Sequence, residues 1–342
     1  MKIVQITTEI KYIALKTPFI TALRRVEHIE FVRVKIECDN GFVSFGEAPA
    51  TKAITGEGIE DILESIATIK EKLYKQELAI ALVIIDDSLI GSSAKASLDM
   101  AIVSLFAQDS KMPLYEYFGA FEPLPLYTDV TISLNKKEKM LKDALYACKN
   151  GMDILKVKLG SNIDDSIVVI QSIATEIPKA KLIIDANQAW SVEDSFKFIQ
   201  AMKNIKLELI EQPVIANDLD GLKLITQNSH IPILADESVF TLEDAKKVIQ
   251  TKSADMINIK LMKCGGITKA IEILNYAREK NIKCMLGSML EGPYSINIAL
   301  HLAIAYSDVI SFIDLDSPLL YKEPSQELAF RFIGSEIVYT PN

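Results

Sequence analysis

Five charged residues recur along the middle of the chain, each at the end of a short apolar run. The intervals between them are 27, 26, 25 and 24 residues, and the residues are Lys158, Asp185, Glu211, Asp236 and Lys260. One strand, one helix and their connections occupy about that length in a parallel barrel. Because the carboxyl ends of such strands meet at one face, the spacing predicts a ring of these side chains at a barrel mouth.

The sequence around this ring also favours a barrel. From residue 125 onward, short apolar runs alternate with stretches whose apolar residues recur at helical spacing. We predict eight strands with seven helices between them, the strands at 126–134, 154–159, 181–185, 207–211, 232–236, 256–261, 283–287 and 312–316. The predicted fold class is therefore α/β, with a modified TIM barrel, (β/α)7β, over residues 123–316.

An additional domain is expected before the barrel, because 342 residues exceed what one hydrophobic core usually serves. Residues 1–122 are predicted to form an α+β capping domain, in which Asp39-Asn40-Gly41 marks a hairpin turn. Residues 317–342 are expected to return to this domain and complete it. Its predicted strands are 2–12, 31–38 and 42–47, and its predicted helices lie near 57–75 and 93–108.

Charge and hydropathy limit the partners of the chain. With 37 Lys+Arg against 46 Asp+Glu the net charge is −9, which argues against nucleic acid or an anionic membrane as a partner. Residues 1–10 alternate like a strand and lack a signal-peptide core, and the apolar run 78–85 is shorter than the about 20 residues that span a bilayer. We expect a cytoplasmic protein with a small-molecule partner, and four free thiols because no CxxC pair occurs.

Three of the ring residues are carboxylates from consecutive strands, Asp185, Glu211 and Asp236. Held together without a cation they would repel one another, whereas hard oxygen ligands of this kind suit Mg²⁺. Each carboxylate alone could instead cap the helix after its strand. Their common depth favours a metal site with one Mg²⁺ per subunit, and Asn187 and Glu237 are auxiliary candidates.

Lysines supply the rest of the predicted chemistry. Lys156 and Lys158 lie two residues apart, so both can face the barrel mouth, and Lys260 lies four strands away from Lys158 on the opposite side. Two bases on opposite faces of a substrate can remove an α-proton and return it with inverted configuration, which is racemisation or epimerisation. The metal and Lys156 would stabilise the carbanion. For Lys263 and Lys269 a solvated surface position is expected.

Together these motifs resemble the enolase superfamily, in particular its muconate-lactonizing subgroup, over nearly the whole chain. The resemblance implies an α+β cap, a (β/α)7β barrel, Mg²⁺ and acid/base catalysis by lysine. The histidine-dependent branch fits less well, because no histidine ends a predicted strand. The matching segments are Lys156-Val-Lys158, Asp185-Ala-Asn187, Glu211-Gln-Pro213, Asp236-Glu-Ser238 and Lys260-Leu-Met-Lys-Cys-Gly-Gly266.

The last predicted strand resembles the Asp-x-Asp element by which dipeptide epimerases hold a substrate ammonium group, here Asp314 and Asp316. Carboxylates at i and i+2 face the same way, and strand eight lies across the mouth from the metal ligands of strand four. A substrate that reaches from the metal to this element is longer than an amino acid. The resemblance thus implies a dipeptide whose C-terminal residue is epimerised, although both aspartates could instead cap the closing segment.

The cap segment 16–25 resembles a specificity loop of the same enzymes. Arg24 falls where Ala-Glu epimerases contact an acidic side chain, which implies conversion of L-Ala-L-Glu to L-Ala-D-Glu. The neighbouring Arg25 is the alternative contact.

Two further loops complete the expected pocket. Residues 48–58 are predicted to form a mobile lid, with Thr51 and Thr55 as candidate substrate contacts. Ser288 and Glu291, after strand seven, are expected to line the pocket.

Other functions stay open from the sequence. The same fold supports o-succinylbenzoate synthase, muconate cycloisomerase and N-acylamino acid racemase, but none of their substrates carries an ammonium group for Asp314 and Asp316. A Schiff-base aldolase that uses Lys260 and a non-catalytic binding protein are alternatives from other classes. A homo-oligomer is expected.

Overall fold

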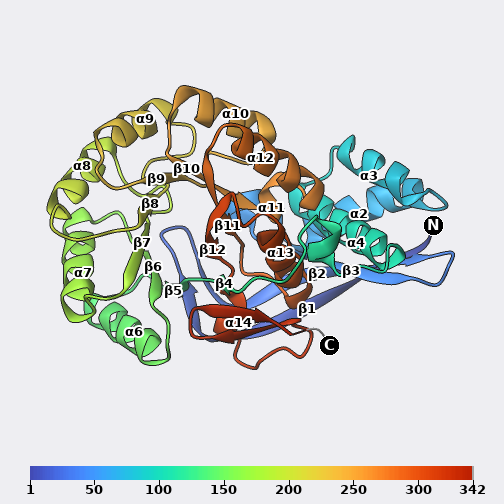
Figure 1. Cartoon of the computed structure of the whole chain (residues 1–342), viewed down its shortest axis with the longest axis horizontal. Helices are drawn as coiled ribbons and strands as arrows, with labels where there is room; N and C mark the ends of the chain where they lie inside the picture. Colours follow the sequence, from blue (N-terminus) through green and yellow to red (C-terminus); the bar gives the residue numbers. More distant parts are fainter. Residues whose placement is uncertain (341–342) are drawn as a thin grey trace.

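The computed structural model describes residues 1–340 and combines an N-terminal antiparallel domain with a parallel barrel (Figure 1). The N-terminal sheet is a three-stranded meander of β1 (Ile3–Ile20), β2 (Arg25–Cys38) and β3 (Val43–Pro49). Helices α2 (Ile59–Leu73), α3 (Leu78–Asp86) and α4 (Ser92–Asp109) pack beside it, with the one-turn helices α1 (Lys52–Thr55) and α5 (Leu114–Tyr117) at either end of the group.

The β1–β2 hairpin is longer than predicted. Pairing continues past Ala14, through a shift in register, to Ile20 and Arg25. At the end of β1 the backbone of Ile20 accepts the Leu134 N–H at 2.9 Å and donates to the Ser133 hydroxyl at 3.2 Å, both just after strand β5 (Val130–Ile132). The hairpin tip, residues 21–24, is thereby attached to the mouth of the barrel.

A glycine allows the cap helix α4 to lie directly on β3. A Cβ atom at Gly46 would stand 1.8 Å from the Ser97 carbonyl oxygen, so no larger residue fits between strand and helix. Helix α4 is correspondingly buried on most of its surface, which explains why its sequence lacks a polar face.

The barrel contains eight parallel strands in sequence order, and the predicted (β/α)7β fold is confirmed. The strands are β5 (Val130–Ile132), β6 (Ile154–Lys158), β7 (Lys181–Asp185), β8 (Leu209–Glu211), β9 (Ile233–Ala235), β10 (Met256–Lys260), β11 (Lys283–Gly287) and β12 (Ile310–Asp314). The connecting helices are α6 (Lys137–Lys149), α7 (Ile163–Glu176), α8 (Val192–Ala201), α9 (Leu219–Asn228), α10 (Leu242–Thr251), α12 (Ile267–Glu279) and α13 (Pro293–Ala305), and the short α11 (Leu261–Cys264) precedes α12.

The first and last barrel strands are joined differently from the others. The strand order runs from β12 to β5, and no pairing between these two strands closes the sheet. Individual hydrogen bonds instead join them, and we call this junction the seam of the barrel. The Asp129 N–H donates to the Ile313 carbonyl at 3.2 Å, and the Thr131 N–H donates to Asp316 Oδ2 at 2.6 Å. The predicted strand 126–134 is consequently split, because β4 (Leu126–Tyr127) pairs elsewhere.

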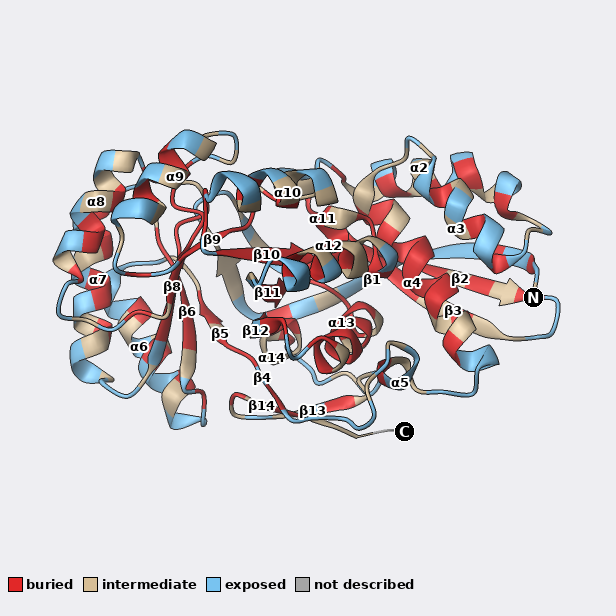
Figure 2. Cartoon of the chain, turned by 45° about the horizontal axis from the view of Figure 1, so that its top comes forward, coloured by how far each residue is buried: buried red, intermediate tan, exposed pale blue. Residues whose placement is uncertain are grey.

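Two layers of apolar side chains support the mouth. One cluster fills the space between the barrel strands and the surrounding helices, and a second lies within the barrel. The inner cluster contains Ile183, Leu209, Leu234, Met256 and Met285. Along β7 and β8 these side chains stand two residues before the charged strand ends, so they form a hydrophobic floor beneath the ring. Figure 2 shows strands β6, β8 and β10 buried along most of their length.

The C-terminal segment contacts both parts of the molecule. Strands β13 (Phe330–Ile333) and β14 (Glu336–Tyr339) form a small sheet with β4, and α14 (Ser317–Leu320) follows β12. Tyr321 makes an isolated bridge to Leu15 of the cap, whereas Phe330 and Ile337 belong to the barrel cluster. Within residues 1–340 no helix has the length and apolar character needed to cross a bilayer.

Cap carboxylates fix the cap on the barrel at two helix N-termini. Asp99 of α4 accepts the Ile267 N–H of α12 at 2.5 Å, and Glu47 of β3 accepts the Tyr294 N–H of α13 at 3.0 Å. A carboxylate at a helix N-terminus satisfies free N–H groups and faces the positive end of the helix dipole. The cap is therefore held in one orientation over the mouth.

One buried histidine predicts a loss of stability in acid. His301 lies 6% exposed among Tyr115, Phe330 and Tyr339, and burial lowers its pKa from 6.5 to about 4. Above pH 6.5 neither the folded nor the unfolded form is protonated there. Between pH 6.5 and 4 only the unfolded chain takes up the proton, so the free energy of unfolding should fall by about 3 kcal/mol.

Chemical denaturation of the unmodified protein and of His301→Phe at pH 7 and pH 4.5 measures this effect. The pH-dependent loss should be smaller in His301→Phe by most of that amount. His230→Phe is the control, because His230 is exposed and its substitution should leave the pH dependence unchanged. Equal pH dependence in His301→Phe and the unmodified protein would contradict the prediction.

Candidate active site

A small cavity lies between the hairpin tip of the cap and the carboxyl ends of the barrel strands. It encloses about 50 Å³, whereas ligand pockets usually enclose about 300 Å³ or more. Side chains from both domains fill most of the mouth. The predicted site residues that line the cavity are Arg24, Lys158, Asn187, Asp236, Glu237, Lys260, Ser288, Asp314 and Asp316.

The register of the sheet brings the predicted ring together. Lys158 is the Cα partner of Asp185, and Asp185 is the partner of Glu211, so these three strand ends are level. Asp236 follows β9 directly, and Lys260 ends β10. All five side chains are buried.

A glycine leaves room for one of these lysines. A Cβ atom at Gly287, the partner of Lys260 on the neighbouring strand, would stand 3.0 Å from Lys260 Cε. The same Cβ atom would stand 2.8 Å from Asn258 Oδ1, so a larger residue at the end of β11 would crowd both Asn258 and Lys260.

Lys156 lies at the centre of the site, fully buried. Its Nζ stands 2.5 Å from Asp314 Oδ2, 2.7 Å from Glu211 Oε2 and 3.3 Å from Asp185 Oδ2. Burial alone would lower its pKa, but these carboxylates outweigh burial and hold the pKa well above its ordinary value. Lys156 is therefore a permanent ammonium group, suited to stabilise negative charge and unsuited to accept a proton.

The two lysines of the ring each pair with a ring carboxylate. Lys158 Nζ lies 2.5 Å from Asp185 Oδ2, and Lys260 Nζ lies 2.7 Å from Asp236 Oδ2. Burial would lower the pKa of Lys260, and the charge of Asp236 raises it above its ordinary value. Both lysines thus sit where a cation that bound the carboxylates would displace them.

The ring carboxylates differ in their proton affinity. Burial raises the pKa of Glu211 to about 7, with the charge of Asp185 adding to it. For Asp185 and Asp236 burial acts in the same direction, but the lysines outweigh it and lower both pKa values. Burial raises the pKa of Glu237 to about 8, and its Oε2 and the Oδ1 of Asn187 have no hydrogen-bond partner among residues 1–340.

Asp314 ends β12, Asp316 follows it two residues later, and both line the cavity. Asp314 is bound to Lys156, and Asp316 also accepts the Thr131 N–H across the barrel seam. Asp316 therefore has a structural bond in addition to its place in the cavity wall.

The side chains of Arg24 and Arg25 lie in different environments. Arg24 lines the cavity, and burial lowers its pKa to about 10; among residues 1–340 no carboxylate forms an ion pair with it. Arg25 is exposed and pairs with Glu27 at 3.0 Å. Of the two guanidinium groups, the structure places only that of Arg24 against the cavity.

Of the remaining predicted substrate contacts, one lines the cavity and three do not. Ser288 lines the cavity, but Glu291 is turned under its own loop, where it accepts the Met289 N–H at 2.8 Å and bonds to the Ser295 hydroxyl. Thr51 is buried, and Thr55 donates to the Thr51 carbonyl at 3.3 Å.

Between these threonines Ile54 contributes the side chain that reaches the cavity. The predicted lid is therefore apolar at its contact point.

Family models match both parts of the chain. "Enolase C-terminal domain-like" matches residues 139–335, and "Mandelate racemase / muconate lactonizing enzyme, N-terminal domain" matches residues 3–119. The chain belongs to the mandelate racemase/muconate lactonizing enzyme family. The resemblance inferred from the motifs is thus confirmed, together with the enolase-type cap and barrel.

Relatives in this family are named as epimerases. The chain is 62% identical over 338 residues to an L-amino acid-D/L-Glu epimerase of Sulfurimonas denitrificans, covering 98% of this chain and 99% of that protein. A substrate-liganded complex of the L-Ala-D/L-Glu epimerase from Bacillus subtilis matches with a TM-score of 0.94 and 40% identity, covering 99% and 96% of the two chains. The expectation of an isomerase agrees with these names.

A third member of the family was solved with a metal and a substrate. The dipeptide epimerase from Enterococcus faecalis V583, complexed with Mg and the dipeptide L-Leu-L-Tyr, matches with a TM-score of 0.93 and 33% identity, covering 99% of this chain and 97% of that one.

One buried carboxylate of the present chain is not indicated by the sequence motifs. Asp129 is completely buried, and ligand oxygens of Asp129, Asp314 and Asp316 all lie within 4.8 Å of one another. Burial and the charge of Asp314 hold the pKa of Asp129 well above its usual range. In residues 1–340 the predicted ligands Asp185, Glu211 and Asp236 do not approach one another this closely, because lysine ammonium groups lie between them.

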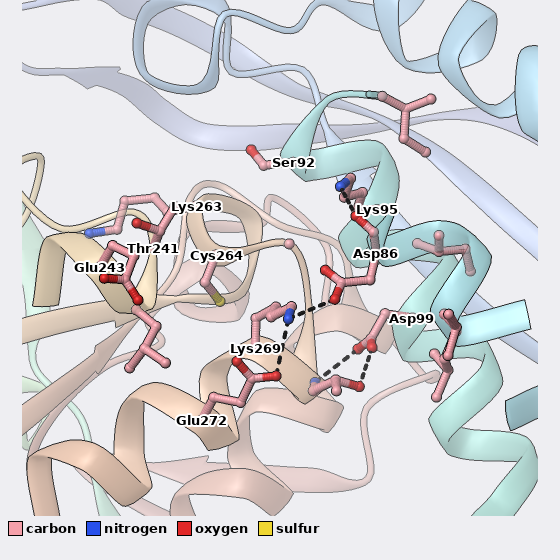
Figure 3. A pocket seen from close by; sticks show the side chains of 17 residues that line it. Asp86, Ser92, Lys95, Asp99, Thr241, Glu243, Lys263, Cys264, Lys269 and Glu272 are labelled. Atoms are coloured by element: carbon pink, nitrogen blue, oxygen red, sulfur yellow. Dashed lines mark hydrogen bonds and ion pairs between the residues drawn. The ribbon is translucent and has the colours of Figure 1, made fainter. Parts of the chain in front are cut away.

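The expectation for Lys263 was wrong. Its side chain is 1% exposed and stands 2.6 Å from Asp236 Oδ1, so it is not a solvated surface lysine. Lys269 is 31% exposed and pairs with Asp86 and Glu272 at the junction of cap and barrel (Figure 3). The short helix α11, which follows β10 without a loop, turns Lys263 inward, and apolar spacing alone does not reveal this turn.

Proposed function

We propose that the chain is a Mg²⁺-dependent dipeptide epimerase that interconverts L-Ala-L-Glu and L-Ala-D-Glu at the α-carbon of the C-terminal residue. The observation that carries this proposal is the placement of Lys158 and Lys260 on opposite sides of one cavity, four strands apart. A base and an acid on opposite faces of an α-carbon invert its configuration.

The residues at the mouth fit a hard divalent cation. Asp185, Glu211 and Asp236 are buried carboxylates from adjacent strand ends, and Asn187 and Glu237 beside them have buried oxygens without partners among residues 1–340. When bound, Mg²⁺ would hold the substrate carboxylate and lower the cost of the negative charge that develops as the α-proton leaves. One ion per subunit would suffice.

The lysines then divide the proton transfer between them. In its neutral form one of Lys158 and Lys260 accepts the α-proton, while the other, as an ammonium group, donates a proton to the opposite face. The two reaction directions exchange these roles. Lys156, whose pKa is raised by three carboxylates, keeps its charge and stabilises the carbanion throughout.

Two charged groups of the proposed dipeptide have partners of opposite charge in the cavity wall. Asp314 and Asp316 offer carboxylates to the substrate ammonium group, and Arg24 offers a buried guanidinium group to the side-chain carboxylate of a C-terminal glutamate. The names of the relatives from Sulfurimonas denitrificans and Bacillus subtilis, both D/L-Glu epimerases, support this choice of residue.

Chiral chromatography of reactions with Mg²⁺ tests the proposed function. L-Ala-L-Glu should approach an equilibrium mixture with L-Ala-D-Glu, and EDTA should stop the reaction. N-acetyl-L-Ala-L-Glu is the matched control, because it lacks the ammonium group and should react far more slowly. Faster conversion of the acetylated compound would favour N-acylamino acid racemisation, and no conversion of any dipeptide would contradict the proposal.

A further inference from the structure

Each of the three proposed metal ligands has one carboxylate oxygen held by a buried donor. Asp185 Oδ1 accepts the Asn187 N–H at 2.9 Å, Glu211 Oε1 accepts from Asn258 Nδ2 at 2.9 Å, and Asp236 Oδ1 accepts from Lys263 Nζ at 2.6 Å. The second oxygen of each carboxylate instead contacts a lysine ammonium group, that of Lys158 for Asp185, Lys156 for Glu211 and Lys260 for Asp236. The three carboxylates therefore share one arrangement, with one oxygen fixed from behind and one directed to the mouth.

Lys263 uses all of its donors in this arrangement. Besides Asp236 Oδ1, its Nζ donates to the Asp236 carbonyl at 2.5 Å and to the Asn258 carbonyl at 2.9 Å. The side chain turns away from Lys269 and Glu272 at the cap–barrel junction (Figure 3). An ammonium group with three fixed acceptors has no freedom to follow a substrate, so its geometry suits the fixing of Asp236.

Asn258 fixes Glu211, the proposed metal ligand at the end of β8. It lies on β10, fully buried, and its amide donates to Glu211 while its backbone carbonyl accepts from Lys263. One residue thus connects the supports of Glu211 and Asp236. Neither Lys263 nor Asn258 lines the cavity, so neither is placed to touch a substrate.

The pairing of Lys260 shows why Asp236 needs a second cation. Lys260 binds Asp236 Oδ2 at 2.7 Å, and it must leave this oxygen when a metal takes it. Lys263 is then the cation that still holds Asp236 in the orientation seen here. Without Lys263, one buried carboxylate would have to be held by the metal alone.

We infer that Lys263 and Asn258 are positioning residues of the metal site, which hold Asp236 and Glu211 in the orientation required for Mg²⁺. This inference rests on the metal site of the proposed function. Groups that orient metal ligands by hydrogen bonds typically change metal affinity by about 10- to 100-fold when they are removed.

Binding of Mn²⁺, a paramagnetic ion with the same preference for oxygen ligands, tests the inference by electron paramagnetic resonance without any dipeptide. Lys263→Met and Asn258→Leu should each raise the Kd for Mn²⁺ by about 10- to 100-fold. Lys269→Met is the matched control, because it removes an ammonium group outside the barrel and should leave the Kd unchanged.

Thermal unfolding separates positioning from a merely structural role. A structural role lowers the Tm without metal but leaves the increase produced by Mn²⁺ intact, whereas a positioning role reduces that increase. If Lys263→Met does not fold, Asn258→Leu decides the question. An unchanged Kd and an unchanged Mn²⁺-induced increase in folded variants would overturn the inference.

The metal measurement also distinguishes this inference from the proposed function. Normal Mn²⁺ binding by the unmodified protein without dipeptide turnover would contradict the substrate but leave the positioning role standing. No Mn²⁺ binding by the unmodified protein would overturn the positioning role as well.

Discussion

Replacing either Lys158 or Lys260 by alanine is expected to lower kcat for epimerisation by about 1,000-fold. Each lysine serves as base in one direction and as acid in the other, so removing one of them blocks inversion both ways. The structure holds both side chains buried at the cavity, where water cannot easily replace them. Initial rates with L-Ala-L-Glu and with L-Ala-D-Glu measure the effect.

Exchange of the α-proton distinguishes these two lysines from residues that only maintain the fold. Each variant should retain exchange with solvent from one diastereomer at most, because one face of the α-carbon keeps its lysine. Lys269→Ala is the control and should retain full activity, since Lys269 lies at the cap–barrel junction. A kcat within about tenfold of the unmodified protein in both variants would contradict the role of the lysine pair.

Replacing Arg24 by methionine is expected to reduce kcat/KM for L-Ala-L-Glu by roughly 30- to 150-fold. Charged hydrogen bonds contribute about 2 to 3 kcal/mol, and each 1.4 kcal/mol corresponds to a factor of ten. Arg24 is the guanidinium group that lines the cavity, and among residues 1–340 it has no carboxylate partner. Most of the loss should appear in KM, because the glutamate side chain does not react.

Arg25→Met is the matched control for this prediction. Arg25 is exposed and bound to Glu27, so its replacement should change kcat/KM by less than about twofold. Arg24→Met should also leave turnover of L-Ala-L-Leu largely intact, because that dipeptide has no side-chain carboxylate. If the preference for a C-terminal glutamate survives in Arg24→Met, another residue determines it.

The position of the ring could be predicted because it follows from spacing alone. A parallel sheet places strand ends at one level, so Lys158, Asp185 and Glu211 had to be neighbours once the strands were recognised. The alternation of side chains along a strand likewise put Lys156 inside with Lys158. Both inferences need only the periodicity of the sequence.

The surroundings of Asp129 could not be predicted from this periodicity. Asp129 directly precedes β5, two residues before the cavity-lining Thr131, and an acidic residue inside the predicted strand 126–134 was the available signal. The seam between β5 and β12 decides its surroundings, because Asp314 and Asp316 come from a strand about 185 residues later. Contacts across a seam without a ladder follow from no local pattern.

The carboxylates that pair with the lysines could not be predicted from the sequence either. Strand position predicts that Lys260 faces the mouth, but its pairing with Asp236 depends on the neighbouring Gly287 and on the inward turn of Lys263. The reach of the β1–β2 hairpin was likewise underestimated, because a shift in register near Ala14 lets pairing resume at Phe19. Local irregularities of this kind are set by tertiary contacts.

Deuterium uptake during a single passage from L-Ala-L-Glu to L-Ala-D-Glu in D₂O tests the two-lysine transfer most directly. Mass spectrometry of the separated diastereomers at early times shows where solvent deuterium enters. We expect early L-Ala-D-Glu to carry deuterium at the glutamate α-carbon while the remaining L-Ala-L-Glu is still largely protiated, because a different lysine donates to the opposite face. Equal labelling of both diastereomers from the start, or product that keeps the original proton, would contradict a transfer shared by Lys158 and Lys260.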